Sequence, residues 1–204
     1  MNVLTGDEHL KFDDMPINRT LSDFWKWNSS DLLNNTLRGS FAEFIVSTAL
    51  DIDLTTAHID WEAYDIRGGG GERIEVKCGA YLQSWQSKNQ PQKLSKIIFS
   101  ISPALYWIPE ECRYQKDSYK RHSDVYVFCL YTSVERKPEN PLTLDNWDFY
   151  VLATKKIDKI FGLQKSVTID ALIKRGNPIK CRYDEIKDAI AKEYRDNVIL
   201  SKDL

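Results

Sequence analysis

The chain has 204 residues, of which 42% are hydrophobic and 12% aromatic, and its formal net charge is −2. This apolar content excludes an intrinsically disordered protein, and no apolar run approaches the roughly 20 residues that a membrane-spanning helix needs. The charge balance argues against a basic nucleic-acid binder but leaves room for a local basic groove.

The chain is predicted to form one domain over residues 1–204, with residues 1–29 as a peripheral extension. Residues 1–19 are polar and are expected to be irregular. They carry no basic region followed by an apolar one, so no secretory signal is expected. The four scattered cysteines fit reduced thiols in a cytoplasmic protein. From Thr20, "TLSDFWKW" predicts a short helix, with Asp23 three residues after the cap.

A longer helix is predicted over residues 30–50. Apolar residues recur at helical spacing and also occupy much of the remaining circumference, so this helix should be covered on more than one side. Glu43 lies in its apolar part. A buried carboxylate without a partner is unfavourable, which favours a partnered role for Glu43, and a surface glutamate is the alternative.

The stretch "YDIRGGGGERIEVKCGAYLQSW" predicts a β-hairpin, because four glycines separate two runs that suit strands. If the turn centres on Gly70, residues whose numbers add to 140 face each other. Asp65 then lies opposite Glu75, and Lys77 shares their face because side chains alternate along a strand. Gln83 falls on the same face if the strand continues undisturbed. The other face is apolar, with Tyr64, Ile66, Ile74 and Val76.

The later elements complete the predicted fold. "KLSKIIFSISP", "DVYVFCLYT" and "NWDFYVLAT" are predicted strands, "QKDSYKRHS" is a basic loop or short helix, and "YDEIKDAIAKEYRDN" is an amphipathic helix. This order favours an α/β (α+β) fold with a central mixed sheet flanked by helices. The tryptophans are assigned to packing: Trp25, Trp27, Trp61, Trp107 and Trp147.

Two facing carboxylates repel each other unless a cation lies between them. Mg²⁺ takes oxygen ligands, commonly one or two carboxylates with water and substrate phosphate. A lysine beside such a pair can act on the attacking water or stabilise the charged transition state. Asp65, Glu75 and Lys77 therefore meet the needs of phosphodiester hydrolysis with Mg²⁺ or Mn²⁺.

Asp65, the hairpin and Glu75-Val76-Lys77 resemble the signature of the PD-(D/E)XK nuclease superfamily, and the chain resembles small bacterial members of it. The resemblance covers residues 30–85. It implies a restriction-endonuclease-like core and a metal-dependent nuclease acting on nucleic acid, with DNA favoured. It also implies that Asp65, Glu75 and the Val76 carbonyl hold the metal, that Lys77 is catalytic and that Glu43 supports the site. Tyr64 stands where the signature has proline.

Several alternatives remain open at this point. The triplet ExK occurs three times in the chain, at Glu75, Glu135 and Glu185, so the motif alone has little specificity. The hairpin charges can also be a solvated ion pair, and the fold can serve as a catalytically inactive nucleic-acid-binding module. No membrane partner is expected, and a homodimer is left open. Candidate substrate contacts, each with a solvated surface residue as the alternative, are Gln83, Lys116, Lys120 and Arg121.

Overall fold

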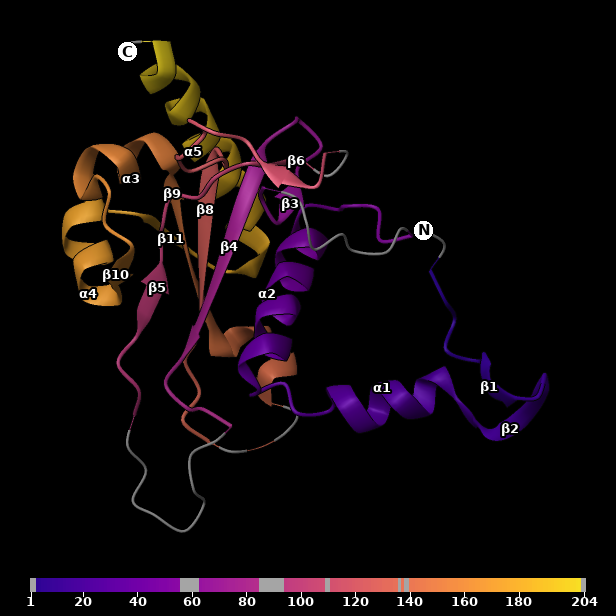
Figure 1. The fold of residues 1–204 in the computed structure, drawn as a ribbon. Coiled ribbons are helices and arrows are strands. Elements are labelled where there is room, and N and C mark those ends of the chain that lie inside the picture. The colour runs from indigo at the N-terminus through magenta and orange to yellow at the C-terminus, as the bar shows by residue number, and fades with distance from the viewer. Residues whose placement is uncertain are drawn as a thin grey trace.

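The structure is a computed structural model that describes residues 3–55, 63–84, 94–108, 111–135, 137 and 140–202. Its centre is a five-stranded mixed sheet with helices on both faces, in the order β11-β9-β8-β4-β3 (Figure 1). The strands are β3 (Ile66–Arg67), β4 (Arg73–Ala80), β8 (Val125–Tyr131), β9 (Trp147–Ala153) and β11 (Ile179–Cys181). The predicted mixed α/β architecture is therefore confirmed.

The middle of the sheet is formed by the most apolar strands of the chain. β8 is buried along its whole length, as its almost continuous apolar sequence predicts. It runs parallel to β4 and antiparallel to β9, and β9 pairs with β11 in antiparallel fashion. β4 alternates between buried and partly buried residues in its first half, so one of its faces is free to carry polar side chains.

One face of the sheet is covered by α2 (Asn35–Ala49) and α5 (Ile186–Lys202). α2 begins after Asn34, whose side chain accepts hydrogen bonds from the N–H groups of Thr36 and Leu37. The predicted start at residue 30 is too early, because Asp31 accepts from the Leu33 N–H and forms a turn there. The 3₁₀ turn η5 (Tyr183–Glu185) leads into α5.

The other face is covered by α3 (Thr154–Phe161), α4 (Ile169–Ala171), the π-helical turn η4 (Leu172–Gly176) and the strand pair β5 (Ile98–Ser100) and β10 (Ser166–Thr168). β5 approaches β4 closely at Gly79, where a Cβ atom would lie 3.1 Å from the Phe99 ring. The short 3₁₀ turns η2 (Asn140–Leu142) and η3 (Leu144–Asn146) precede β9.

The N-terminal extension differs from the expectation of irregular structure. It contains the hairpin β1 (His9–Phe12) and β2 (Met15–Thr20), followed by α1 (Leu21–Ser29), and it projects from the body (Figure 1). Asp13 and Asp14 both have positive φ, the geometry of a two-residue hairpin turn that is usually built with Asn-Gly or Asp-Gly. The predicted capping box of Thr20 and Asp23 is confirmed.

Tryptophan packing is only partly as expected. Trp147 lies in the core and is 4% exposed. Trp27 is 81% exposed on α1, a helix with no buried residue, so its assignment to packing is wrong. Trp61 lies outside the described residues. Within the described ranges, no helix has the length and apolar character needed to cross a bilayer.

Candidate active site

The predicted register of the glycine hairpin is confirmed. Ile66 pairs with Ile74 and Arg67 with Arg73, so the numbers of paired residues add to 140. The turn is closed by hydrogen bonds from the Gly68 N–H to the Glu72 carbonyl, 2.8 Å, and from the Gly71 N–H to the Gly68 carbonyl, 3.0 Å. β3 begins at Ile66, so Asp65 lies one residue before the ladder.

Asp65 reaches the exposed edge of β4 with its side chain. Its Oδ2 accepts a hydrogen bond from the Val76 N–H at 2.6 Å, and its own N–H donates to the Ile74 carbonyl at 3.0 Å. The N–H and C=O of a strand residue point to the same side of the strand. The Val76 carbonyl therefore points to the edge that the Asp65 carboxylate occupies.

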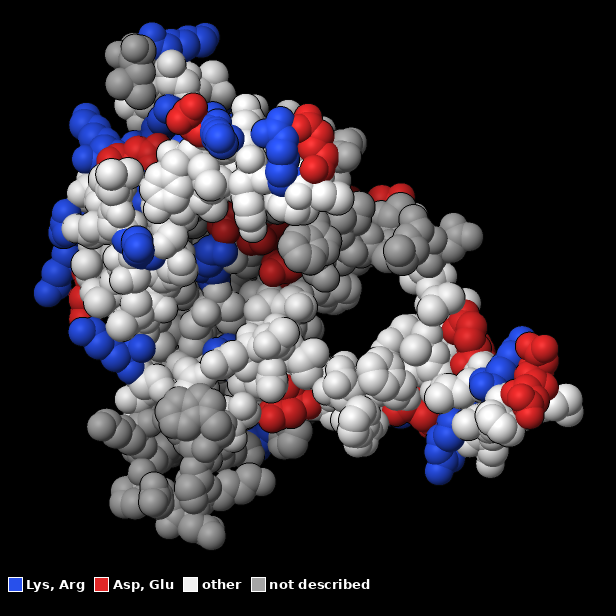
Figure 2. Space-filling view, viewed as in Figure 1, with Lys and Arg blue, Asp and Glu red and all other residues white. Residues whose placement is uncertain are grey.

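Glu75 and Lys77 form an ion pair on one face of β4, with Oε1 and Nζ 2.5 Å apart. Burial raises the pKa of Glu75, Lys77 lowers it, and the Asp65 charge raises it further. Burial lowers the pKa of Lys77, but the charges of Glu75, Asp65 and Glu43 together hold it above its usual value. Figure 2 shows acidic and basic side chains recessed in a hollow at the centre of this view.

The pKa of Glu75 is raised mainly by burial, whereas the pKa of Lys77 is raised by the carboxylates around it. Three carboxylates favour the charged form of Lys77, whereas Glu75 has one cation near it and a second carboxylate that opposes its ionisation. Glu43 comes from α2 and is partly buried, and its charge also acts on the thiols of Cys78 and Cys129. The structure thus brings Asp65, Glu75 and Glu43 within electrostatic range of Lys77.

Gln83 does not lie where the undisturbed strand would place it, because β4 ends at Ala80. Its Nε2 donates to the Ala80 carbonyl at 2.8 Å, and its Oε1 accepts from Arg38 at 3.4 Å. Arg38 is 4% exposed and also donates to the Leu33 carbonyl at 2.8 Å. Gln83 therefore links the end of β4 to α2, which differs from its expected place beside Glu75 and Lys77.

Arg38 is a buried charged residue of α2 that the sequence analysis did not single out. It lies one helical turn before Ala42 and two before Val46, both fully buried, so its burial follows from the spacing. Burial raises the pKa of the Cys78 thiol to about 11, and Arg38 opposes this rise. Cys78 is consequently a protonated packing residue at neutral pH.

The three basic candidates do not share one surface. Lys116 and Lys120 are exposed, but Arg121 is buried. Its guanidinium donates to Asp158 at 2.6 Å and to three backbone carbonyls at 2.7, 2.8 and 3.0 Å, those of Ile101, Gly162 and Gln164. Arg121 therefore fastens the segment before β8 to the end of α3, and the expectation of an exposed phosphate contact at Arg121 does not fit its position.

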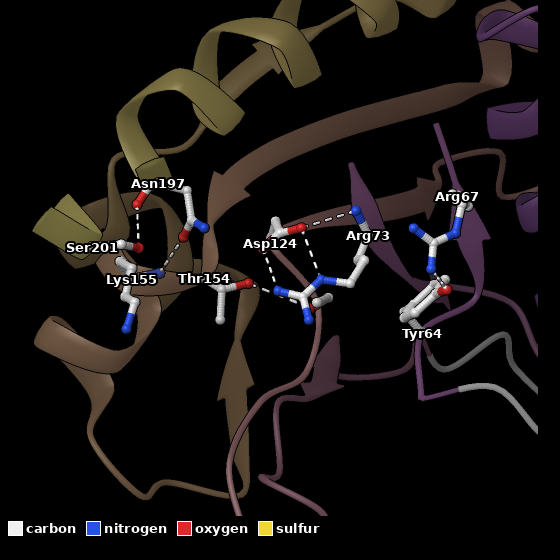
Figure 3. Close-up of polar contacts among 9 residues, drawn as sticks. Tyr64, Arg67, Arg73, Asp124, Thr154, Lys155, Asn197 and Ser201 are labelled. Atoms are coloured by element: carbon white, nitrogen blue, oxygen red, sulfur yellow. Dashed lines mark hydrogen bonds and ion pairs between the residues drawn. The ribbon is translucent and has the colours of Figure 1, made fainter. Parts of the chain in front are cut away.

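The start of β4 is fixed by Asp124 (Figure 3). The Asp124 carboxylate accepts two hydrogen bonds from the Arg73 guanidinium, 3.0 and 2.6 Å, and one from the Arg73 N–H, 3.0 Å. The Asp124 N–H donates back to the Arg73 carbonyl at 2.7 Å. β8 then places Tyr126 beside Glu75. Burial and the Glu75 charge raise the pKa of Tyr126, so its phenol stays neutral.

The side chains at the site match a magnesium ion in ligand type. Asp65 uses one carboxylate oxygen for the Val76 N–H and Glu75 uses one for Lys77, which leaves a second oxygen on each. Two carboxylates and a carbonyl are ligands that Mg²⁺ accepts together with water. Across the described ranges, no three His, Cys, Asp or Glu side chains converge into an ion-binding group.

The other ExK triplets lack this setting. Glu135 pairs with Lys137 at 2.9 Å in an exposed loop, and Glu185 accepts from the Arg182 N–H at 2.8 Å in the turn before α5. The comparisons with known proteins add no family to this picture: no protein-family model matches the chain, and no curated protein matches it either.

Proposed function

We propose that the protein is a Mg²⁺- or Mn²⁺-dependent nuclease with a restriction-endonuclease-like core, hydrolysing phosphodiester bonds of nucleic acid, with DNA as the favoured substrate. The observation that supports this most is the surplus of carboxylates around Lys77. Three carboxylates act on one ammonium in a partly buried place. A divalent cation would balance the remaining negative charge.

Each residue has a defined part in this proposal. Asp65, Glu75 and the Val76 carbonyl would hold the metal, and Glu43 would support it from α2. The hydrogen bond from the Val76 N–H fixes the Asp65 carboxylate at the edge of β4. When bound, the ion would polarise the phosphate and lower the pKa of a water molecule.

Lys77 acts as a cation in this account. In the metal-free protein, the acids around it hold its pKa above the usual value, so it is an ammonium at neutral pH. An ammonium has no lone pair with which to accept a proton from water. Of the two roles open to this lysine, we propose stabilisation of the negative charge that develops on the phosphate, which needs the ammonium form.

The test is a cleavage panel. Purified protein is incubated with single-stranded DNA, double-stranded DNA and RNA in Mg²⁺, Mn²⁺, Ca²⁺ or EDTA. We expect cleavage of at least one substrate in Mg²⁺ or Mn²⁺, no cleavage in EDTA, and loss of most cleavage in Lys77→Ala purified in the same way. Cleavage that persists in EDTA would contradict the metal requirement, and no cleavage of any substrate would contradict the nuclease.

A nucleic-acid-binding module without catalysis is the second candidate. It is favoured by the direct pairing of Lys77 with Glu75, since an ion pair can by itself stabilise a charged strand face. Nucleic-acid binding in EDTA together with no cleavage under any metal condition would support this module over the nuclease.

A further inference from the structure

Residues 104–122, called here the aromatic segment, connect β5 to β8 of the central sheet. Its described part contains the short strands β6 (Trp107–Ile108) and β7 (Arg113–Tyr114), which pair in antiparallel fashion. The base of the segment is closed by an isolated bridge between Ala104 and Lys120, with backbone hydrogen bonds of 3.0 and 3.1 Å. The Ala104–Lys120 bridge therefore forms a stem that holds the two ends of the segment together.

This segment presents aromatic rings to solvent. Tyr106 is 40% exposed, Tyr114 56% and Tyr119 52%. Tyr114 packs edge-on against Trp107 with ring centroids 5.0 Å apart, because paired residues lie on one face of the strand pair. Tyr106 lies 5.6 Å from the His122 ring. Rings held by neighbours lose little freedom when a flat partner stacks on them.

Free cationic groups lie among these rings. Lys116 and Lys120 are exposed, and neither forms an ion pair with any described residue. Arg113 in contrast is paired with Glu111 at 2.5 Å. Exposed aromatic rings interleaved with unpaired lysines suit unpaired bases joined by phosphates, since every base has a flat face and every phosphate a negative charge. A duplex hides its base faces within the stack.

The stem returns to the body beside the candidate active site. His122 contacts the Ala104 carbonyl at 3.0 Å, and Asp124 then meets Arg73 at the start of β4. Tyr126, two residues further on, lies beside Glu75. A strand held on the aromatic segment would therefore continue toward Glu75 and Lys77.

We infer that the aromatic segment binds single-stranded nucleic acid, stacking bases on Tyr106, Tyr114 and Tyr119 and holding phosphates with Lys116 and Lys120. That the bound strand is the substrate rests on the proposed function, because this strand would be the one cleaved. Binding of the strand itself depends only on the aromatic segment.

Fluorescence anisotropy in EDTA tests the binding. The probes are labelled single-stranded DNA, single-stranded RNA and double-stranded DNA of equal length. The wild type is expected to bind a single strand at least tenfold more tightly than the duplex, and the DNA and RNA arms show which sugar is preferred. Tyr114→Ala with Tyr119→Ala should weaken single-strand binding by about tenfold for each ring, whereas the matched Tyr→Phe pair should keep it.

A second variant separates phosphates from bases. Lys116→Ala with Lys120→Ala should reduce the slope of log affinity against log salt by about 1.4, because each phosphate contact on a single strand contributes about 0.7. Thermal unfolding of each variant, expected near the wild-type temperature, checks that the fold is kept.

The two proposals fail separately. Equal or tighter duplex binding, or unchanged single-strand binding by the alanine pair of tyrosines, would overturn the inference even if the protein cleaves. Tight single-strand binding that depends on the tyrosines, with no cleavage in any metal, would leave the inference standing and overturn the nuclease.

Discussion

Lys77 and Glu75 lie two residues apart on β4 and form an ion pair of 2.5 Å in a partly buried place, yet the pKa of Glu75 is raised. Burial and the Asp65 charge therefore outweigh the attraction of the lysine. This imbalance predicts that the stability of the metal-free protein depends on the protonation of Glu75.

Glu75→Gln is expected to stabilise the metal-free protein at pH 7. A raised pKa means that ionised Glu75 is less favourable in the folded chain than in the unfolded one. The wild type should gain stability from this group as pH falls through its folded pKa, which lies above 4.5. Urea unfolding from pH 4 to pH 8 checks this, with the advantage of the variant shrinking toward the acidic end. A variant less stable than wild type at pH 7 would mean that the ion pair dominates.

Asp65→Ala is expected to abolish Mg²⁺ or Mn²⁺ binding in calorimetry. The substitution removes a carboxylate and leaves the Val76 N–H without its partner. Asp148→Ala is a suitable control, since Asp148 lies on β9 and pairs with Lys180 of β11, at the edge of the sheet opposite to β3. The wild type and this control should both gain thermal stability from the ion, because binding only to the folded state stabilises it. Equal metal binding by all three proteins would remove Asp65 from the site.

Lys77→Arg is expected to retain more cleavage than Lys77→Ala, which should lose at least about 100-fold in kcat. Arginine keeps a positive charge at every accessible pH, although its geometry differs. If Lys77 served as a base, both variants would be equally inactive. Single-turnover rates of the two variants and the wild type between pH 7 and pH 9 distinguish these cases.

Arg121→Ala is expected to destabilise the protein by about 3 kcal/mol, because three backbone carbonyls and Asp158 lose a buried donor. Lys120→Ala, its exposed neighbour, should change stability by no more than about 0.5 kcal/mol. Chemical unfolding of the two variants measures both values. Similar small effects would show that the Arg121 contacts contribute little.

The sequence predicts the hairpin well because two independent signals agree there. The glycine run marks the turn, and the alternation of apolar and charged residues sets the register. In both observed pairs the two residue numbers add to 140, as predicted. The burial of Arg121 had no such signal. It adjoins exposed Lys120 in a polar run, and its acceptors come from residues about 20 and about 40 positions away in the chain.

Two other misses have local causes. The alternation of side chains predicts the face on which Gln83 lies only if β4 continues to it. The strand ends at Ala80, so this prediction does not apply. The β1–β2 hairpin was missed because its turn is made by Asp13 and Asp14 instead of a glycine. The position of Glu43 near Lys77 depends on how α2 packs on the sheet, which the spacing of apolar residues in one helix does not define.

The most direct measurement compares three matched substitutions in one cleavage assay with Mg²⁺: Glu75→Gln, Glu135→Gln and Glu185→Gln. Each removes one negative charge from an ExK triplet at nearly constant shape. Glu135 and Glu185 are exposed, and neither lies on a strand of the sheet. The account predicts that Glu75→Gln loses cleavage while the other two remain near wild type. Wild-type cleavage by Glu75→Gln, with loss in either of the others, would contradict an active site at the hairpin.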